Sequence, residues 1–206
     1  MTADFHFYEP LLGHGLAHDP FNSIVGPRPI GWIGTRSRDG RLNLAPYSFF
    51  NAFNYVPPVI GFASVGAKDT LRNVQETGEF SWNLVSRDLA DAMNRSSASV
   101  PYGVDEFSLA GLTAADSRLI GAPRVAESMV SFECKVTQCV QLVALDASPL
   151  QTWLVLGQVL GVHIAQTLLK NGVYDTAAAH PVLRGGGAGD YFEIAAEQLF
   201  QMKRPS

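Results

Sequence analysis

The stretch from residue 129 to residue 143 reads Met-Val-Ser-Phe-Glu-Cys-Lys-Val-Thr-Gln-Cys-Val-Gln-Leu-Val. Apolar and polar side chains alternate along it, as they do in an antiparallel β-strand with one face on a core and the other toward water. We expect the buried face to carry Val130, Phe132, Cys134, Val136, Val140 and Leu142, and the open face Ser131, Glu133, Lys135, Thr137 and Gln141.

Other stretches extend this β pattern in both directions. Residues 29–35, 42–50, 58–64, 79–86, 151–164 and 191–194 are rich in β-branched, aromatic and other apolar side chains. Glycines inside them favour a closed, strongly coiled barrel over a flat sheet, because glycine within strands often marks bulges and tight bends. Helical patterns are fewer: one helix capped by Asp69 and stopped at Gly78, and a second over 88–97. The prediction is a mainly β, antiparallel barrel with a few short helices.

Length and composition describe one compact domain over residues 1–206. The chain is 47% hydrophobic and 17% charged with a formal net charge of −4, so it can bury a core and is not of a disordered composition. Residues 1–20 form an N-terminal extension without a secretory pattern, and no apolar run is long enough for a bilayer. The absence of a basic stripe disfavours nucleic acid as a partner. We expect a cytoplasmic protein with no membrane partner.

Several chemical motifs are weak on inspection. His14 and His18 have the spacing of a helical metal pair, but the adjacent Gly and Pro residues oppose that helix, so no metal site is expected. His163 lies in an apolar strand and is interpreted as a hydrogen-bonded structural imidazole. Cys134 and Cys139 are five positions apart along one strand, so we expect them on opposite strand faces, unable to bridge each other, as small buried side chains. The run 185–189 lacks the following helix of a dinucleotide loop.

One segment has the chemistry of an anion site. Lys68 and Arg72 lie at the start of the helix expected after residue 68, where partial positive charge already gathers. Hydroxyls of Ser64 and Thr70, together with first-turn N–H groups, would complete a phosphate pocket. An ordinary capped helix, with Asp69 neutralising its neighbours, is the alternative interpretation.

A second segment, residues 43–50, follows an Asp-Gly hairpin signal. Pro46 interrupts a β run there and frees main-chain groups, while Ala45 and Ser48 are small enough to admit a planar ligand. The aromatic side chains of Tyr47, Phe49 and Phe50 could wall such a ligand. Edge strands interrupted by proline, with aromatic clusters, also occur in β cores that bind nothing.

Together these segments resemble one family. The matching words are Pro27-Arg28-Pro29-Ile30-Gly31-Trp32-Ile33 with Thr35, Asn43-Leu44-Ala45-Pro46-Tyr47-Ser48-Phe49-Phe50-Asn51, Pro57-Pro58, Lys68-Asp69-Thr70 with Asn73, Thr77-Gly78-Glu79-Phe80 with Asn83, and Gly103-Val104-Asp105-Glu106-Phe107 with Gly111-Leu112-Thr113. A weaker match includes Pro181-Val182-Leu183-Arg184-Gly185-Gly186 and Tyr191. The chain resembles the flavin reductase-like family of FMN-binding split β-barrels, in its flavoredoxin-like branch.

The resemblance implies an antiparallel split barrel, a homodimer, and FMN near the subunit interface. By analogy, Ala45, Pro46, Tyr47, Ser48 and Phe49 would line the flavin ring. Ser64, Lys68, Asp69, Thr70 and Asn73 would surround the phosphate end, and Thr35 and Asn43 would support that wall. FAD remains an alternative to FMN, because an adenylate could extend outward from the same pocket. The third glycine, Gly187, departs from the family pattern.

The implied activity is hydride transfer from NADH or NADPH onto FMN, with electrons then passed to an acceptor such as a monooxygenase partner. The flavin supplies this chemistry, so no catalytic side chain is expected. The alternative is a flavin-binding electron carrier that does not react with nicotinamide. The long segment 98–126, interpreted as loop, is either a lid or a dimer-facing excursion. As a lid, it would cover the flavin ring or shape the nicotinamide site, with Tyr102 among the residues involved.

Overall fold

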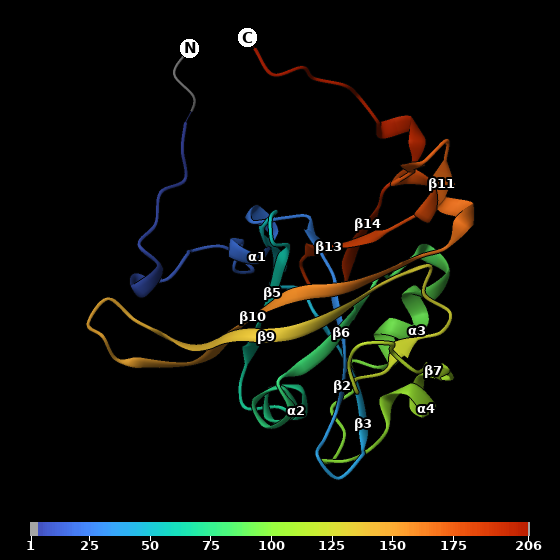
Figure 1. The fold of residues 1–206 in the computed structure, drawn as a ribbon. Coiled ribbons are helices and arrows are strands. Elements are labelled where there is room, and N and C mark those ends of the chain that lie inside the picture. The colour runs from blue at the N-terminus through green and yellow to red at the C-terminus, as the bar shows by residue number, and fades with distance from the viewer. Residues whose placement is uncertain (1–3, 206) are drawn as a thin grey trace.

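A computed structural model describes residues 4–205 (Figure 1). Its main sheet has seven strands, every adjacent pair antiparallel, in the order β3–β2–β6–β9–β10–β5–β4. Their bounds are β2 Gly31–Arg36, β3 Leu42–Tyr47, β4 Phe50–Asn54, β5 Val59–Val65, β6 Glu79–Asn83, β9 Val130–Val143 and β10 Pro149–Ile164. The expectation of a mainly β, antiparallel fold is confirmed.

Connectivity forces this sheet to curl. β3 and β4 are its two outer strands, yet β3 ends at Tyr47 and β4 begins at Phe50, so the opposite edges must come close together. The edges meet without a ladder between them, which makes the barrel a split one. Pro46 lies in the outer strand β3, where a missing N–H is tolerated.

Smaller elements surround the barrel. Three strands form a second sheet, β1–β13–β14, and two strand pairs stand alone. Their bounds are β1 Arg28–Pro29, β13 Val182–Gly186, β14 Asp190–Glu193, β7 Ala114–Ala115, β8 Arg124–Val125, β11 Leu169–Lys170 and β12 Val173–Tyr174. The α-helices are α1 Phe21–Ile24, α2 Asp69–Thr77, α3 Ala90–Arg95 and α4 Glu106–Ala110, and the 3₁₀ turns are Pro10–Leu12, Arg87–Leu89, Gln166–Leu168, Ala177–Ala179 and Ala196–Gln198.

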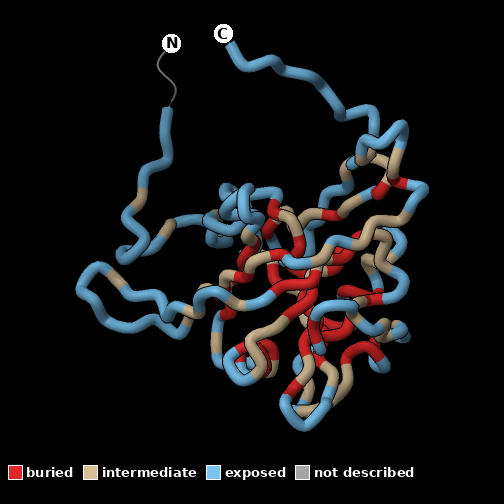
Figure 2. The backbone as a smooth tube through the Cα atoms, viewed as in Figure 1, coloured by how far each residue is buried: buried red, intermediate tan, exposed pale blue. Residues whose placement is uncertain are grey.

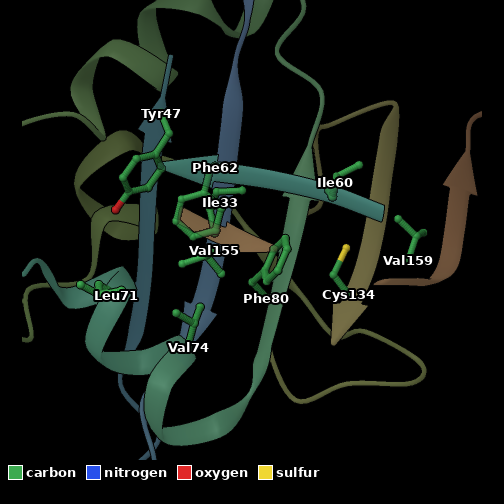
Figure 3. Packing of buried hydrophobic residues seen from close by; sticks show 10 residues of the cluster. All are labelled: Ile33, Tyr47, Ile60, Phe62, Leu71, Val74, Phe80, Cys134, Val155 and Val159. Atoms are coloured by element: carbon green, nitrogen blue, oxygen red, sulfur yellow. The ribbon is translucent and has the colours of Figure 1, made fainter. Parts of the chain in front are cut away.

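The core lies on both faces of β2. Ile33 packs inside the barrel with Phe62 and Phe80 (Figure 3), whereas Trp32 packs with Phe107 under helices α3 and α4. Figure 2 shows the buried residues concentrated in the sheet and beneath these helices. Because packed side chains cover both faces of the sheet, few places remain where a ligand could bind.

Several predicted boundaries are wrong in instructive ways. The stretch 29–35 divides at Ile30 into β1 and β2, which belong to different sheets, and 42–50 divides into β3 and β4 at the barrel opening. The stretch 79–86 ends as a strand at Asn83, and 88–97 is a 3₁₀ turn followed by α3. Hydrophobicity alone does not mark these divisions, because an apolar run can continue while the chain passes from one sheet or edge to another.

Strand β9 is mostly buried in its first half and mostly exposed in its second half. In its first half the predicted open face is buried: Ser131 and Glu133 are fully buried because segment 113–128 packs over them. In its second half Val140 and Leu142 are exposed, because there β9 pairs only with β10 and projects from the body (Figure 1). The predicted buried face therefore holds from Val130 to Val136, whereas the prediction fails where Ser131 and Glu133 are buried and where Val140 and Leu142 are exposed.

The two cysteines lie on one face. The β9–β10 register shifts between Val136 and Gln138, so Thr137 is an extra residue and the alternation reverses after it. Cys134 is buried in the barrel core and Cys139 packs against the same cluster. The prediction of opposite faces is wrong, because residue spacing alone does not reveal a β-bulge. Both cysteines have free thiols.

Segment 98–126 is more ordered than a loop. It contains α4 and the β7–β8 pair, and Phe107 and Val125 are completely packed within the core. Residues 4–20 contain no buried side chain. Their status as an extension, and the single-domain assignment, remain predictions.

Candidate functional site

A hollow of about 430 Å³ opens where β3, the start of α2 and the segment before α4 meet. Seven of the predicted site residues line it: Asn43, Ala45, Pro46, Tyr47, Lys68, Asp69 and Thr70. The structure thus brings together the two segments that the sequence singled out separately. The remaining lining comes from residues 96–100 and Glu106.

Behind this hollow lies a polar wall made of Thr35, Asn43, Thr70 and Asn73, all buried. Asn43 Nδ2 donates to Thr35 Oγ1 at 3.1 Å and to Thr70 Oγ1 at 2.9 Å. Asn73 Nδ2 donates to Thr35 Oγ1 at 3.0 Å, while Asn73 Oδ1 is buried without a partner. Such a network fixes side-chain positions before any ligand arrives, because each alternative rotamer would strand a buried polar atom.

Tyr47 is buried in the barrel core but reaches the hollow. Its ring packs on Phe62, with 4.7 Å between centroids, and its hydroxyl points away from that ring (Figure 3). The hydroxyl is buried and has no hydrogen-bond partner. Burial raises the pKa of Tyr47, and the nearby hydroxyls of Thr70 and Ser64 oppose that rise. A buried orphan O–H costs free energy unless a ligand atom meets it.

The start of α2 forms a cationic rim, which we define as Lys68 and Arg72. Lys68 is the N-cap residue, and no side chain caps the helix, so the prediction that Asp69 is the cap is wrong. Asp69 is instead the first helical residue, and its Oδ2 accepts from Gly103 N at 3.4 Å. First-turn N–H groups left without a side-chain cap and an exposed lysine beside the hollow favour an anion there.

Arg72 is held away from the hollow by an aromatic contact. Its guanidinium lies over the Tyr102 ring at 4.1 Å, and Arg41 lies over the same ring at 5.2 Å. Stacking leaves the guanidinium N–H groups available to an anion. Tyr102 does not line the hollow, so its predicted role as the cover of a ligand is not supported by its position, although residues 98–100 from the same segment do line it.

Three predicted site residues lie elsewhere. Ser64 is buried and donates to Gly66 O at 2.9 Å, and Ser48 gives its carbonyl to Arg28 Nε at 3.0 Å. Phe49 is partly exposed, with the Arg28 guanidinium over its ring at 5.6 Å. The chain turns between β3 and β4 directly after Tyr47, which carries Ser48 and Phe49 out of the hollow.

Glu106 lines the hollow and is not among the predicted site residues. It is buried and accepts from Leu44 N at 3.1 Å, which ties α4 to β3. Burial is the main cause of its raised pKa; the hydrogen bond from Leu44 opposes the rise, and the Asp69 and Asp105 carboxylates add to it. The sequence signal that could have identified it is the family motif at residues 103–107, in which Glu106 directly precedes the buried Phe107.

In the described part of the chain, no group of three or more His, Cys, Asp or Glu side chains is placed to hold a metal ion. Over the same residues, no helix has the length and apolar character to cross a bilayer. The glycine loop 185–187 lies beside α1, where a Cβ at Gly186 would collide with Ser23, so its glycines serve close packing.

The fold and the hollow define a class: an antiparallel split barrel with a preformed polar pocket at a cationic helix start. The family model described as "Flavin reductase like domain" matches residues 26–182. The chain therefore belongs to the flavin reductase-like family.

Relatives agree with this assignment. An uncharacterized protein of Halalkalibacterium halodurans is 37% identical over 190 residues, which cover 88% of each chain. Nitrilotriacetate monooxygenase component B from Bacillus cereus has a TM-score of 0.80 at 29% identity and covers 88% of this chain and 91% of its own. A Shewanella frigidimarina protein described as having a split barrel domain has a TM-score of 0.79 at 25% identity and covers 90% of each chain.

Proposed function

We propose that this chain is an FMN-dependent oxidoreductase that accepts hydride from NADH or NADPH onto FMN and passes electrons to an acceptor. The observation that carries the proposal is the orphan hydroxyl of Tyr47 in a pocket whose mouth is the uncapped, cationic start of α2. A ligand that is polar in its middle and anionic at one end would satisfy both features. FMN has that form.

The residues have separate tasks in this proposal. Lys68, Thr70 and the first-turn N–H groups of α2 would hold the phosphate end, with Arg72 adding charge from the rim. Ala45, Pro46 and Tyr47 would lie against the flavin, and the polar wall would keep Thr70 in place. FMN, when bound, supplies hydride chemistry at its ring, and the protein excludes water and orients the group.

A direct test uses the whole chain with FMN. We expect FMN to bind, and the oxidised flavin absorbance to be lost rapidly when NADH or NADPH is added without oxygen, relative to free FMN. If FMN binds but neither nucleotide bleaches it, the protein is an electron carrier. If FMN does not bind, the pocket assignment is wrong.

The variant Tyr47→Phe tests the carrying observation. Without FMN it should be as stable as wild type or more stable, by up to about 1 kcal/mol, because an unsatisfied buried hydroxyl is removed. With FMN its Kd should rise about fivefold, because the ligand loses a partner. Tyr174→Phe, half-buried beside a different cavity, is the matched control. An unchanged Kd in Tyr47→Phe would contradict the placement.

A homodimer is part of the proposal. At the projecting end of the β9–β10 hairpin, the relative exposure of Val143 is 60% and Leu145 is fully exposed. In the single chain this end of the hairpin is therefore an uncovered apolar surface. Apolar patches of this kind favour a protein partner. Light scattering should give a molar mass twice that of the chain. The double variant Val143→Glu, Leu145→Glu should have the molar mass of a single chain. A wild-type monomer would contradict this proposal.

The acceptor and the compartment follow by analogy. One structural relative is a monooxygenase component B, which supports a monooxygenase as the partner that receives electrons. A cytoplasmic location fits a nicotinamide donor. Mixing reduced protein with a candidate partner, and following reoxidation of the flavin, would test that transfer.

A further inference from the structure

A second cavity, of about 630 Å³, lies on the other side of β9 from the barrel core. Glu133 is at its base, on the strand face opposite Cys134, and is fully buried. None of the residues assigned to the cofactor pocket lines this cavity.

Glu133 is locked by three donors. Its Oε1 accepts from Arg118 N at 2.8 Å and contacts His163 Nε2 at 2.5 Å, and its Oε2 accepts from Leu119 N at 2.6 Å. Burial opposes ionisation, but these hydrogen bonds outweigh it and hold the pKa of Glu133 below its ordinary value. The interpretation of His163 as a hydrogen-bonded imidazole is confirmed, and Nδ1 is the nitrogen it has left for a ligand.

Two guanidiniums face the same cavity. Arg124 Nη2 donates to Asp116 O at 3.1 Å, but Arg124 Nε is buried and has no partner. Among residues 4–205, neither Arg118 nor Arg124 makes an ion pair. Because Glu133 brings one negative charge against two positive ones, the cavity has an excess of positive charge and one stranded donor.

Apart from Ser128, whose hydroxyl donates to the carbonyls of Leu84 and Val130, the rest of the lining is apolar. Leu119, Met129 and Ile164 contribute to it, together with small residues that keep it open. A Cβ at Gly161 would come within 3.3 Å of Leu119 and 3.5 Å of Glu133, so a larger residue there would crowd the cavity. Inorganic anions gain nothing from such walls, whereas an organic anion can bury its hydrocarbon part.

We propose that this cavity is a second binding site, for a small organic carboxylate whose anionic end meets Arg124 Nε, Arg118 and His163 Nδ1. Its apolar part would lie against Met129 and Ile164. The site is independent of the proposed flavin reaction, because the two pockets share no lining residue.

The test is a calorimetric titration of the whole chain, with FMN present at saturation, using benzoate as the probe. Benzamide has nearly the same shape without the charge, and inorganic phosphate has the charge without the ring. Benzoate should bind with a Kd of about 1 mM, as befits so small a ligand, and both comparison compounds should bind at least about tenfold more weakly.

Variants locate the binding. Arg124→Ala should weaken benzoate binding about tenfold, and His163→Gln and the exposed Arg118→Ala by a smaller factor. Arg38→Ala is the matched control, because it also removes one charge and one guanidinium-to-carbonyl hydrogen bond, from Arg38 Nη2 to Glu76 O at 3.1 Å, outside the cavity. It should leave the Kd unchanged. If Arg124→Ala does not fold, Arg118→Ala and His163→Gln decide.

Four results would overturn the proposal. The first three are no binding of benzoate, equally tight binding of benzamide, and binding of benzoate by the folded variants as by wild type. Benzoate that binds only when FMN is left out would belong to the cofactor pocket, and that too would overturn it.

Discussion

The polar wall behind the hollow and the cationic rim at the start of α2 are built on opposite physical terms. Wall residues are buried and bonded to one another, as Asn43 is to Thr35 and Thr70. Rim residues Lys68 and Arg72 are exposed, and Arg72 is held only by the Tyr102 ring. The wall is therefore part of the folded state itself, whereas the rim matters only when an anion is present.

The largest effect should come from breaking the wall. Asn43→Leu removes two buried hydrogen bonds and should lower the free energy of unfolding by about 2–3 kcal/mol, measured by denaturant titration. Lys68→Ala, on the rim, should change it by less than about 0.5 kcal/mol. Equal losses in the two variants would remove the distinction between wall and rim.

Next in size is the effect of the rim on binding. Lys68→Ala should raise the Kd for FMN about tenfold, because a charge-assisted contact to phosphate is lost, and added salt should narrow the difference. Arg72→Ala should have a smaller effect, since that side chain does not line the hollow. Fluorescence titration of FMN measures both. If a folded Lys68→Ala, Arg72→Ala double variant binds FMN as wild type does, the phosphate end lies elsewhere.

A smaller effect is expected at Tyr102. Tyr102→Ala frees Arg72 and Arg41 from the ring, and the looser rim should raise the Kd for FMN about twofold to threefold. Stopped-flow reduction with NADH or NADPH gives the second reading. If neither the Kd for FMN nor the rate of flavin reduction changes, Tyr102 is not part of a lid over the flavin.

The smallest expected effect is on stability at Glu106. Its raised pKa means that the fold disfavours the charged carboxylate, so the cost is present at neutral pH and is relieved as the pH falls through that pKa. Glu106→Gln should therefore be more stable than wild type at pH 7, by less than about 1 kcal/mol, and this gain should vanish in acid. Glu127→Gln, an exposed carboxylate that also accepts a main-chain N–H, should show no such gain. A gain at Glu106 that persists in acid would exclude this explanation.

Much of the site was readable from local sequence. Lys68 at a helix start, Pro46 in a β run and Tyr47 beside it are short-range signals, and each lies where the hollow is. Glu106 and residues 96–100 were not assigned, because their approach to β3 depends on contacts such as the Leu44–Glu106 hydrogen bond between distant segments. Ser48 and Phe49 do not line the hollow because the chain turns directly after Tyr47, and their contact with a flavin stays a prediction.

The sequence alone determined the kind of local structure: extended stretches, a helix ended by Gly78 in the left-handed conformation, and cations at that helix's start. Those features follow from side-chain shape and backbone sterics, which act over a few residues. Tertiary structure decided the rest. The bulge at Thr137 turned Cys139 toward the core, and the packing of segment 113–128 buried Glu133 on a face that alternation marks as open. Such outcomes depend on which distant surfaces meet, and no local pattern carries that information.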